Sequence, residues 1–199
     1  MMDDSRLAES GSTPSAENQQ VARVVDEAFG GDWEATEHSD RDGHRFHLLT
    51  SPDTPQKGLI SFSTIGLSDF QPVGEHRPPL GVELTAVSPH APFANVVTAT
   101  GLCAIQHGWL LHPGLVVLGI VAEHFNDAPL PHLLLIEPFV WDNKVHSRVL
   151  ATKTVAWVLG VPISQAEAQY CHDHGFDALD ELFEQAQPDH FDLSRASIV

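Results

Sequence analysis

Basic side chains are scarce in this sequence: lysine and arginine total 10, against 27 aspartates and glutamates, which gives a formal net charge of −17. Proteins that bind nucleic acids or anionic membrane surfaces use Lys and Arg to neutralise phosphates. The composition therefore argues against both kinds of partner. A basic protein partner is permitted, because opposite potentials steer association, although an acidic composition can also serve solubility alone.

Cysteines and long apolar runs are also scarce. The two cysteines, Cys103 and Cys171, provide no disulfide framework, and both lie in helix-like apolar stretches, so we predict buried free thiols. A reducing cytoplasm is the simplest location for such a chain. No apolar run reaches the roughly 18 residues of a membrane span, and the acidic start is unlike a secretory signal.

Motifs of common enzyme classes are missing. The sequence contains no G-x-S-x-G nucleophile elbow and neither of the phosphate-binding patterns G-x-x-x-x-G-K and G-x-G-x-x-G. Ser68 stands beside Asp69 in a suggestive turn, but adjacent Ser and Asp usually form a turn or a helix cap. We predict no catalytic residue and no cofactor. An enzyme of unknown chemistry is an alternative hypothesis, and it would require Asp69, Glu83 and histidines in one pocket.

Thirteen histidines raise the question of a metal site. The densest local group is Cys171-His172-Asp173-His174. Helical geometry places Cys171 and His174 on one face but points His172 and His174 about 200° apart. A zinc site there would need ligands from elsewhere, such as His190, so we predict no metal site.

The acidic residues are concentrated at the two ends of the chain. Residues 1–43 contain 11 acidic and 3 basic residues, residues 164–199 contain 8 and 1, and residues 44–163 contain 8 and 6. The nearly balanced middle is therefore the predicted core. If the partner is basic, the terminal segments are the natural source of contacts.

Apolar patterning predicts helices and strands in one chain. Residues 1–12 lack periodicity, so we predict a disordered tail followed by a single domain over residues 13–199. Helices are predicted over residues 14–29, 88–107, 164–174 and 176–187. Strands are predicted over residues 33–38, 44–50, 57–64, 80–87, 115–122, 133–140 and 149–158, with the runs 115–122 and 133–140 as central strands covered on both faces.

Two glutamates interrupt these apolar strands. Glu83 lies within the fourth predicted strand and Glu137 within the sixth. A carboxylate in such a place is either on the solvent side of its strand or buried with a partner. We predict the solvent side for both residues.

The connection between the third and fourth predicted strands is the most distinctive stretch, and it opens with the sequence G-L-S-D-F at positions 66–70. A loop mounted between two core strands is a rigid platform for recognition. We therefore predict a partner-contact surface that includes Ser68, Asp69, Phe70 and Glu75. The structural alternative is a turn in which Gly66 supplies an unusual φ, Leu67 fills the core and Asp69 caps backbone amides.

Four pieces of the sequence occur in this order: Ile60-Ser61-Phe62, the motif at 66–70, Gly81-Val82-Glu83-Leu84-Thr85, and Pro162-Ile163-Ser164-Gln165-Ala166-Glu167 with Gly175 downstream. Together they resemble the suppressor of fused family, in particular its small bacterial members. The likeness spans residues 20–199. The chain departs from the animal proteins by inserting three residues between Phe62 and Gly66, and we expect no room for their second domain.

The resemblance implies a non-enzymatic, single-domain α+β fold with a mixed, mostly antiparallel sheet and helices packed on it. It also implies binding of another protein. Bacterial members resemble immunity proteins that neutralise a co-encoded toxin, whereas animal members hold an extended transcription-factor peptide between two domains. We therefore predict a cytoplasmic immunity protein or antitoxin, with a basic toxin as its natural partner. The alternative is a regulatory scaffold that captures an extended peptide by strand addition.

Overall fold

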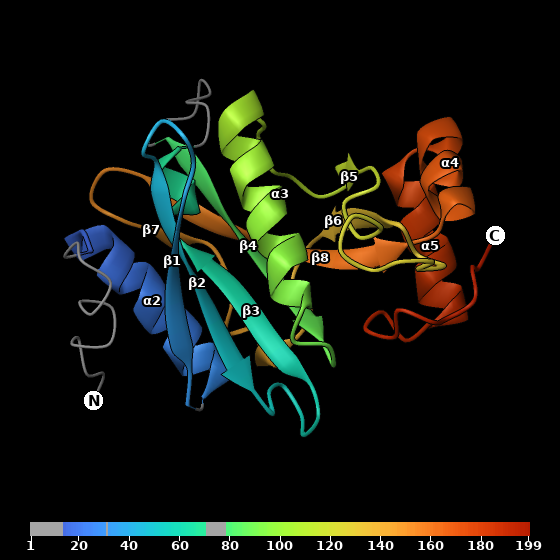
Figure 1. Ribbon diagram of the computed structural model, residues 1–199, viewed down its shortest axis with the longest axis horizontal. Helices are drawn as coiled ribbons and strands as arrows, with labels where there is room; N and C mark the ends of the chain where they lie inside the picture. The colour runs from blue at the N-terminus through green and yellow to red at the C-terminus, as the bar shows by residue number, and fades with distance from the viewer. Residues whose placement is uncertain (1–13, 31, 71–78) are drawn as a thin grey trace.

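The computed structural model describes residues 14–30, 32–70 and 79–199 (Figure 1). The predicted tail at residues 1–12 and the predicted contact residue Glu75 lie outside these ranges. Within them the chain forms one sheet with helices on its two faces, which confirms the predicted α+β fold class.

The described part of the chain forms an eight-stranded sheet. Its strands are β1 (Glu34–Ser39), β2 (Arg45–Pro52), β3 (Ile60–Ile65), β4 (Leu80–Ser88), β5 (Val116–Val117), β6 (His132–Ile136), β7 (Arg148–Val149) and β8 (Thr154–Ile163). The order is β1-β2-β3-β4-β8-β6-β5, and β7 also pairs with β8. Only the β4–β8 pair is parallel among these strands, so the prediction of a mixed, mostly antiparallel sheet is confirmed.

Four helices cover the sheet in the described ranges: α2 (Ala16–Phe29), α3 (Phe93–His107), α4 (Gln165–His174) and α5 (Phe176–Ala186). The α2 helix begins at Ser15, whose side chain accepts a hydrogen bond from the Asn18 amide, and ends at the left-handed residue Gly30. The predicted helix over residues 164–174 begins with a capping box at α4, where Ser164 and Glu167 cap each other's backbone amides. No helix among the described residues has the length and apolar character needed to span a membrane.

The sheet separates two apolar cores. The α2 helix packs on one face, and α4 and α5 pack on the same face at the far end of the sheet. The α3 helix packs on the opposite face and stands in front of the sheet in Figure 1. Both faces of the central strands are therefore buried, which accounts for the nearly continuous burial of β4, β6 and β8.

The prediction of a central strand over residues 115–122 is wrong. Only Val116–Val117 is extended, and this short strand is at the edge of the sheet, because the chain turns away at Gly119 with a φ of 75°. Ile120 and Val121 are nevertheless buried against α3 and its neighbours. A loop that contributes to the core thus produces the same apolar run as a buried strand. The predicted strand over 149–158 is likewise divided between β7 and β8 by a turn.

Candidate functional site

The turn that follows β3 is built around one buried carboxylate. Glu83, in the middle of β4, is fully buried. Its oxygens accept hydrogen bonds from the backbone amides of Gly66 (2.9 Å), Leu67 (3.2 Å) and Ser68 (3.1 Å), and from the Thr64 hydroxyl (2.6 Å). The prediction of a solvent-facing Glu83 is therefore wrong, because the turn supplies the donors that burial of a carboxylate requires. The amide-capping role that we considered for Asp69 belongs to Glu83.

Two glycines allow the turn to approach β4 this closely. Gly66 has a φ of 94°, in the left-handed region that favours glycine. A Cβ atom on Gly81 would lie 2.5 Å from the carbonyl oxygen of Ser68, so no larger residue fits there without movement of the turn. The short helix η1 (Leu67–Asp69) is thus locked onto β4, and the two sequence motifs at 66–70 and 81–85 form one hydrogen-bonded unit.

Lys153 and Asn18 bring two further elements to this turn. The Lys153 ammonium, just before β8, donates to Ser68 Oγ at 2.7 Å and pairs with Asp69 Oδ1 at 2.5 Å. The side-chain amide of Asn18, on α2, donates to Asp69 Oδ2 at 2.9 Å. No sequence pattern indicates a role for Lys153 or Asn18, because neither belongs to a motif and Lys153 is 84 positions from Asp69.

The buried position of Glu83 shifts the pKa of its carboxyl group. Burial raises the pKa of Glu83, while hydrogen bonds from Thr64 and Ser68 and the charge of Lys153 oppose that rise. The carboxylate is fully buried and surrounded by donors from the fold itself. It cannot reach a substrate, so it does not form the pocket with Asp69 and histidines that the enzyme hypothesis required.

Three of the four predicted contact residues lie in the described part of the chain, and they differ in exposure. The Ser68 side chain is buried against Lys153. The Asp69 side chain is 38% exposed, and the half-buried ring of Phe70 meets the ring of His44 edge-on at 5.0 Å between centroids. Asp69 and Phe70 therefore form the outward edge of the turn, and Glu75 lies outside the described residues. The contact role of these residues remains a prediction.

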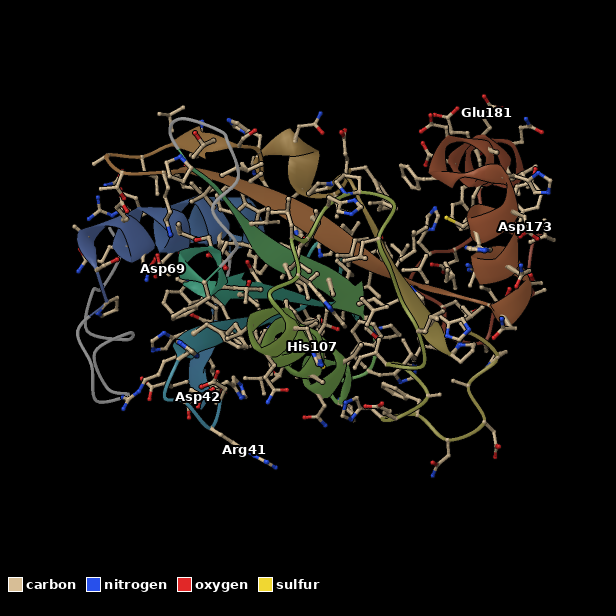
Figure 2. All side chains as sticks on the ribbon, turned by 90° about the horizontal axis from the view of Figure 1, so that it is seen from above. Arg41, Asp42, Asp69, His107, Asp173 and Glu181 are labelled. Atoms are coloured by element: carbon tan, nitrogen blue, oxygen red, sulfur yellow. The ribbon has the colours of Figure 1, made fainter. Side chains whose placement is uncertain are left out.

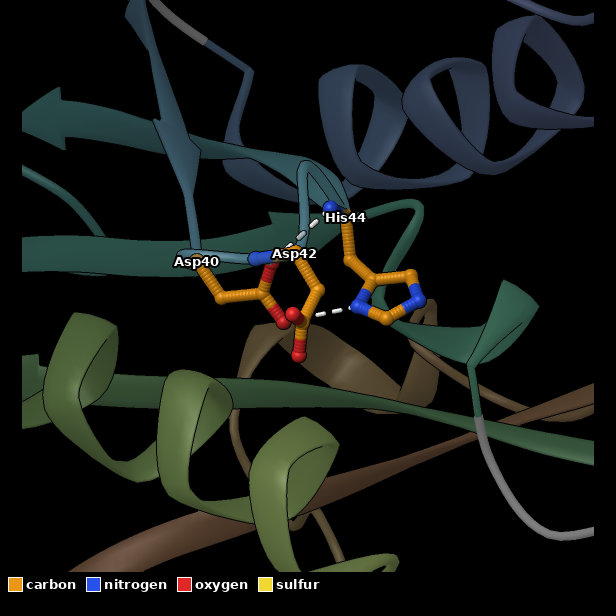
Figure 3. A group of neighbouring side chains, drawn as sticks. All are labelled: Asp40, Asp42 and His44. Atoms are coloured by element: carbon orange, nitrogen blue, oxygen red, sulfur yellow. Dashed lines mark hydrogen bonds and ion pairs between the residues drawn. The ribbon is translucent and has the colours of Figure 1, made fainter.

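The β1–β2 turn beside Phe70 gathers Asp40, Asp42 and His44, with one potential ligand atom from each within 4.8 Å of the others (Figure 3). Asp40 accepts hydrogen bonds from the backbone amides of Asp42 and His44, both at 2.9 Å, and pairs with the His44 ring at 2.7 Å. These bonds are those of an Asp-initiated turn, and they account for the geometry without an ion.

The C-terminal end of the molecule contains a second buried carboxylate. Glu167 accepts two hydrogen bonds from the Arg195 guanidinium, at 2.6 and 3.0 Å, and one from the Ile198 amide at 3.1 Å. Burial acts to raise the pKa of Glu167, but the hydrogen bonds and charge of Arg195 outweigh it, so the pKa is lowered. This ion pair ties the last residues to the first turn of α4.

Comparison with known proteins now identifies the family. The family model "Suppressor of fused protein (SUFU)" matches residues 38–196. The chain belongs to the suppressor of fused family. It is also 32% identical over 187 residues to the "Immunity protein YqcF" of Bacillus subtilis, an alignment that covers 92% of this chain and 97% of that protein.

Solved structures of suppressor of fused proteins share the fold. A homologue from Neisseria gonorrhoeae superposes with a TM-score of 0.71 at 17% identity, covering 92% of this chain and 96% of that one. A chain of the Sufu–Fu complex gives 0.68 at 14% identity, covering 90% and 91%. Drosophila Suppressor of Fused gives 0.56 at 16% identity, where 77% of this chain matches 42% of that chain. The predicted fold is therefore confirmed.

Proposed function

We propose that this protein is a cytoplasmic immunity protein that binds a toxin protein and neutralises it without catalysing a reaction. The observation that carries the proposal is the 32% identity, over nearly the whole of both chains, with a protein named as an immunity protein. The net charge of −17 supports a basic toxin as the partner. An acidic protein can occupy the phosphate-binding surface of a nuclease and associate with it rapidly.

Part of the proposed contact surface is the outward edge of the turn after β3. Asp69 and Phe70 face outward there, and Figure 2 shows Asp42 at the same end of the molecule as Asp69. Ser68 supports this edge by fixing Lys153, which in turn pairs with Asp69. Glu75 is the fourth residue of the proposed surface.

Co-expression with the protein encoded beside its gene tests this function. We expect rescue of growth from the toxicity of that neighbour, and a complex that survives size-exclusion chromatography at low salt and weakens as salt rises. An unrelated protein of similar size and net charge is the control, and it should give neither rescue nor a complex. Absence of both rescue and complex for the native pair would contradict the proposal.

Capture of an extended peptide by strand addition is the alternative function. One observation favours it: β5 is paired only with β6 among the described strands, and Leu118 beside it is 69% exposed. An edge strand can template a peptide through its free backbone groups. Isothermal titration separates the two functions, because a scaffold binds short peptides from its partner, whereas an immunity protein requires the folded toxin.

A further inference from the structure

A cleft of about 610 Å³ lies beside α5, away from the turn that follows β3. Figure 2 places Asp69 and Glu181 of α5 at opposite ends of the molecule. The cleft is lined by α5, by the segment after β6 and by the segment after α5. Neither the family motifs nor the proposed contact surface at Asp69 and Phe70 involves it.

One wall of the cleft is aromatic. The Phe139 ring is 50% exposed, and its centroid is 5.5 Å from the His190 ring, which meets Phe183 edge-on at 5.0 Å. Phe191 stacks behind Phe139 at 6.3 Å. The rings are therefore held in place by one another, and half of Phe139 remains accessible beside the cleft. Such faces attract cations through the ring quadrupole.

The rim of the cleft is acidic. Glu137, Asp180 and Glu184 line it, and none of the three forms an ion pair with a residue that the structure describes. Asp180 and Glu184 are four residues apart on α5, where like charges repel. No lysine or arginine lines the cleft. The nearby Arg195 pairs with Glu167 and lies 5.6 Å from the centroid of the Phe183 ring, and it forms no ion pair with the three acidic residues in the described structure.

Two further features make the cleft favourable for a cation. It includes Gln187 and Pro188 at the C-terminal end of α5, and the last turn of this helix has no basic residue. The negative end of the helix dipole is therefore not neutralised by a side chain of its own. His190 lines the cleft, and its Nδ1 atom is buried without a hydrogen-bond partner in the described structure.

We propose that this cleft binds an arginine side chain that projects from the partner protein. This inference rests on the proposed function, and it adds a second contact region to the one at Asp69 and Phe70. Arginine fits better than lysine, because its planar guanidinium stacks on an aromatic face while its N–H groups donate to carboxylates at the edge. The cleft volume is within the range of sites that enclose small ligands.

A peptide titration tests the cleft without the toxin. The probe is acetyl-Gly-Arg-Gly-amide, followed by two-dimensional NMR of the labelled full-length protein at low salt. We expect saturable shifts centred on residues 137–139 and 180–190. The same peptide with citrulline, which keeps the shape but lacks the charge, should give none. Shifts spread equally over the other acidic surfaces, such as the β1–β2 turn, would overturn the inference.

A matched pair of variants localises the effect. Asp180→Asn with Glu184→Gln removes two charges from the rim, and Asp177→Asn with Glu181→Gln removes two charges from the same helix outside the cleft. We expect the first variant to weaken the arginine peptide by about fivefold and the second by less than about twofold, because only the first removes charges close to the bound cation. Equal weakening by both variants would show a general charge effect and overturn the inference.

The toxin gives the second readout. The rim variant should weaken the complex by about tenfold and the control variant should not. If the toxin binds both variants as tightly as the wild type, the cleft inference fails and the immunity function stands. If no toxin binds while the arginine peptide still selects the cleft, the immunity function fails and the cleft stands as an arginine site.

Discussion

Where β3 leads into β4, the Glu83 carboxylate is fully buried and accepts hydrogen bonds from three backbone amides and one hydroxyl. At the α5 end, the carboxylates of Asp180 and Glu184 line an open cleft and form no ion pair with any residue described by the structure. Both regions combine negative charge with apolar neighbours, but only the first region supplies hydrogen-bond donors for its buried carboxylate.

The difference separates carboxylates that hold the fold from carboxylates that remain available. Glu83 uses its acceptor capacity within the turn, so it contributes to stability and cannot meet a partner. Asp180 and Glu184 gain nothing from each other and would be neutralised by an external cation. The motif residues Gly66, Gly81 and Glu83 therefore hold the fold, whereas the carboxylates of Asp180 and Glu184, which lie outside the family motifs, remain available to a partner.

The largest expected effect is at Glu83. Glu83→Ala leaves three buried amides without an acceptor, and we expect it to lower the free energy of unfolding by about 4 kcal/mol, measured by urea denaturation. The matched control is Glu123→Ala, an exposed glutamate, which should change stability by less than about 0.5 kcal/mol. A Glu83→Ala protein as stable as this control would show that the Glu83 carboxylate does not stabilise the turn after β3.

The second effect is at the buried ion pair of the C-terminal end. Arg195→Ala leaves Glu167 buried without its cation, and we expect a loss of about 3 kcal/mol in the free energy of unfolding. The control is Arg41→Ala in the β1–β2 turn, where Figure 2 shows the side chain extended away from the protein. If Arg195→Ala costs no more than Arg41→Ala, the tail is not anchored by this pair.

Sequence patterns were sufficient where a local signal coincides with the final environment. The helices predicted over residues 14–29 and 164–174 are both present. Their signals, the apolar face of α2 and the capping box of Ser164 and Glu167, are contained within a few residues. The prediction of a strand over residues 115–122 was wrong, because a buried loop and a buried strand have the same apolar composition.

The candidate sites depend on contacts that no local pattern contains. The burial of Glu83 follows from backbone amides 15 to 17 positions earlier, and backbone groups have no sequence signature. Lys153 reaches Asp69 across 84 positions. The helix over residues 176–187 was predicted, but the cleft beside it exists only because the segments around Phe139 and His190 meet α5 without filling the space.

The pH dependence of stability should have opposite signs at the two buried glutamates. The pKa of Glu167 is lowered from 4.5, so its contribution is present above that pH and is lost as pH falls through the folded pKa. The pKa of Glu83 is raised from 4.5, so stability falls as pH rises from 4.5 through the folded pKa. Urea denaturation from neutral pH to below 4.5 measures both effects.

Charge-free variants assign each effect to its residue. On acidification, the wild type should lose stability relative to Glu167→Gln and gain stability relative to Glu83→Gln. Parallel curves for all three proteins would show that neither carboxylate has a different proton affinity in the folded and unfolded states.

The smallest effects on stability, and the most informative on function, are expected at two partly exposed rings. Phe139→Ala removes the accessible face of the cleft, and Phe70→Ala removes the ring at the outward edge of the β3 turn. Each should cost less than about 1 kcal/mol of stability. Because Phe139 is half exposed and Phe70 already packs on His44, we expect affinity for the proposed toxin to fall by about tenfold for Phe139→Ala and by about threefold for Phe70→Ala. Isothermal titration with the proposed toxin measures both values.

A larger loss of affinity for Phe70→Ala than for Phe139→Ala would show that the main contact lies at the turn after β3. An additive loss in the double variant would show that one toxin binds at both ends independently.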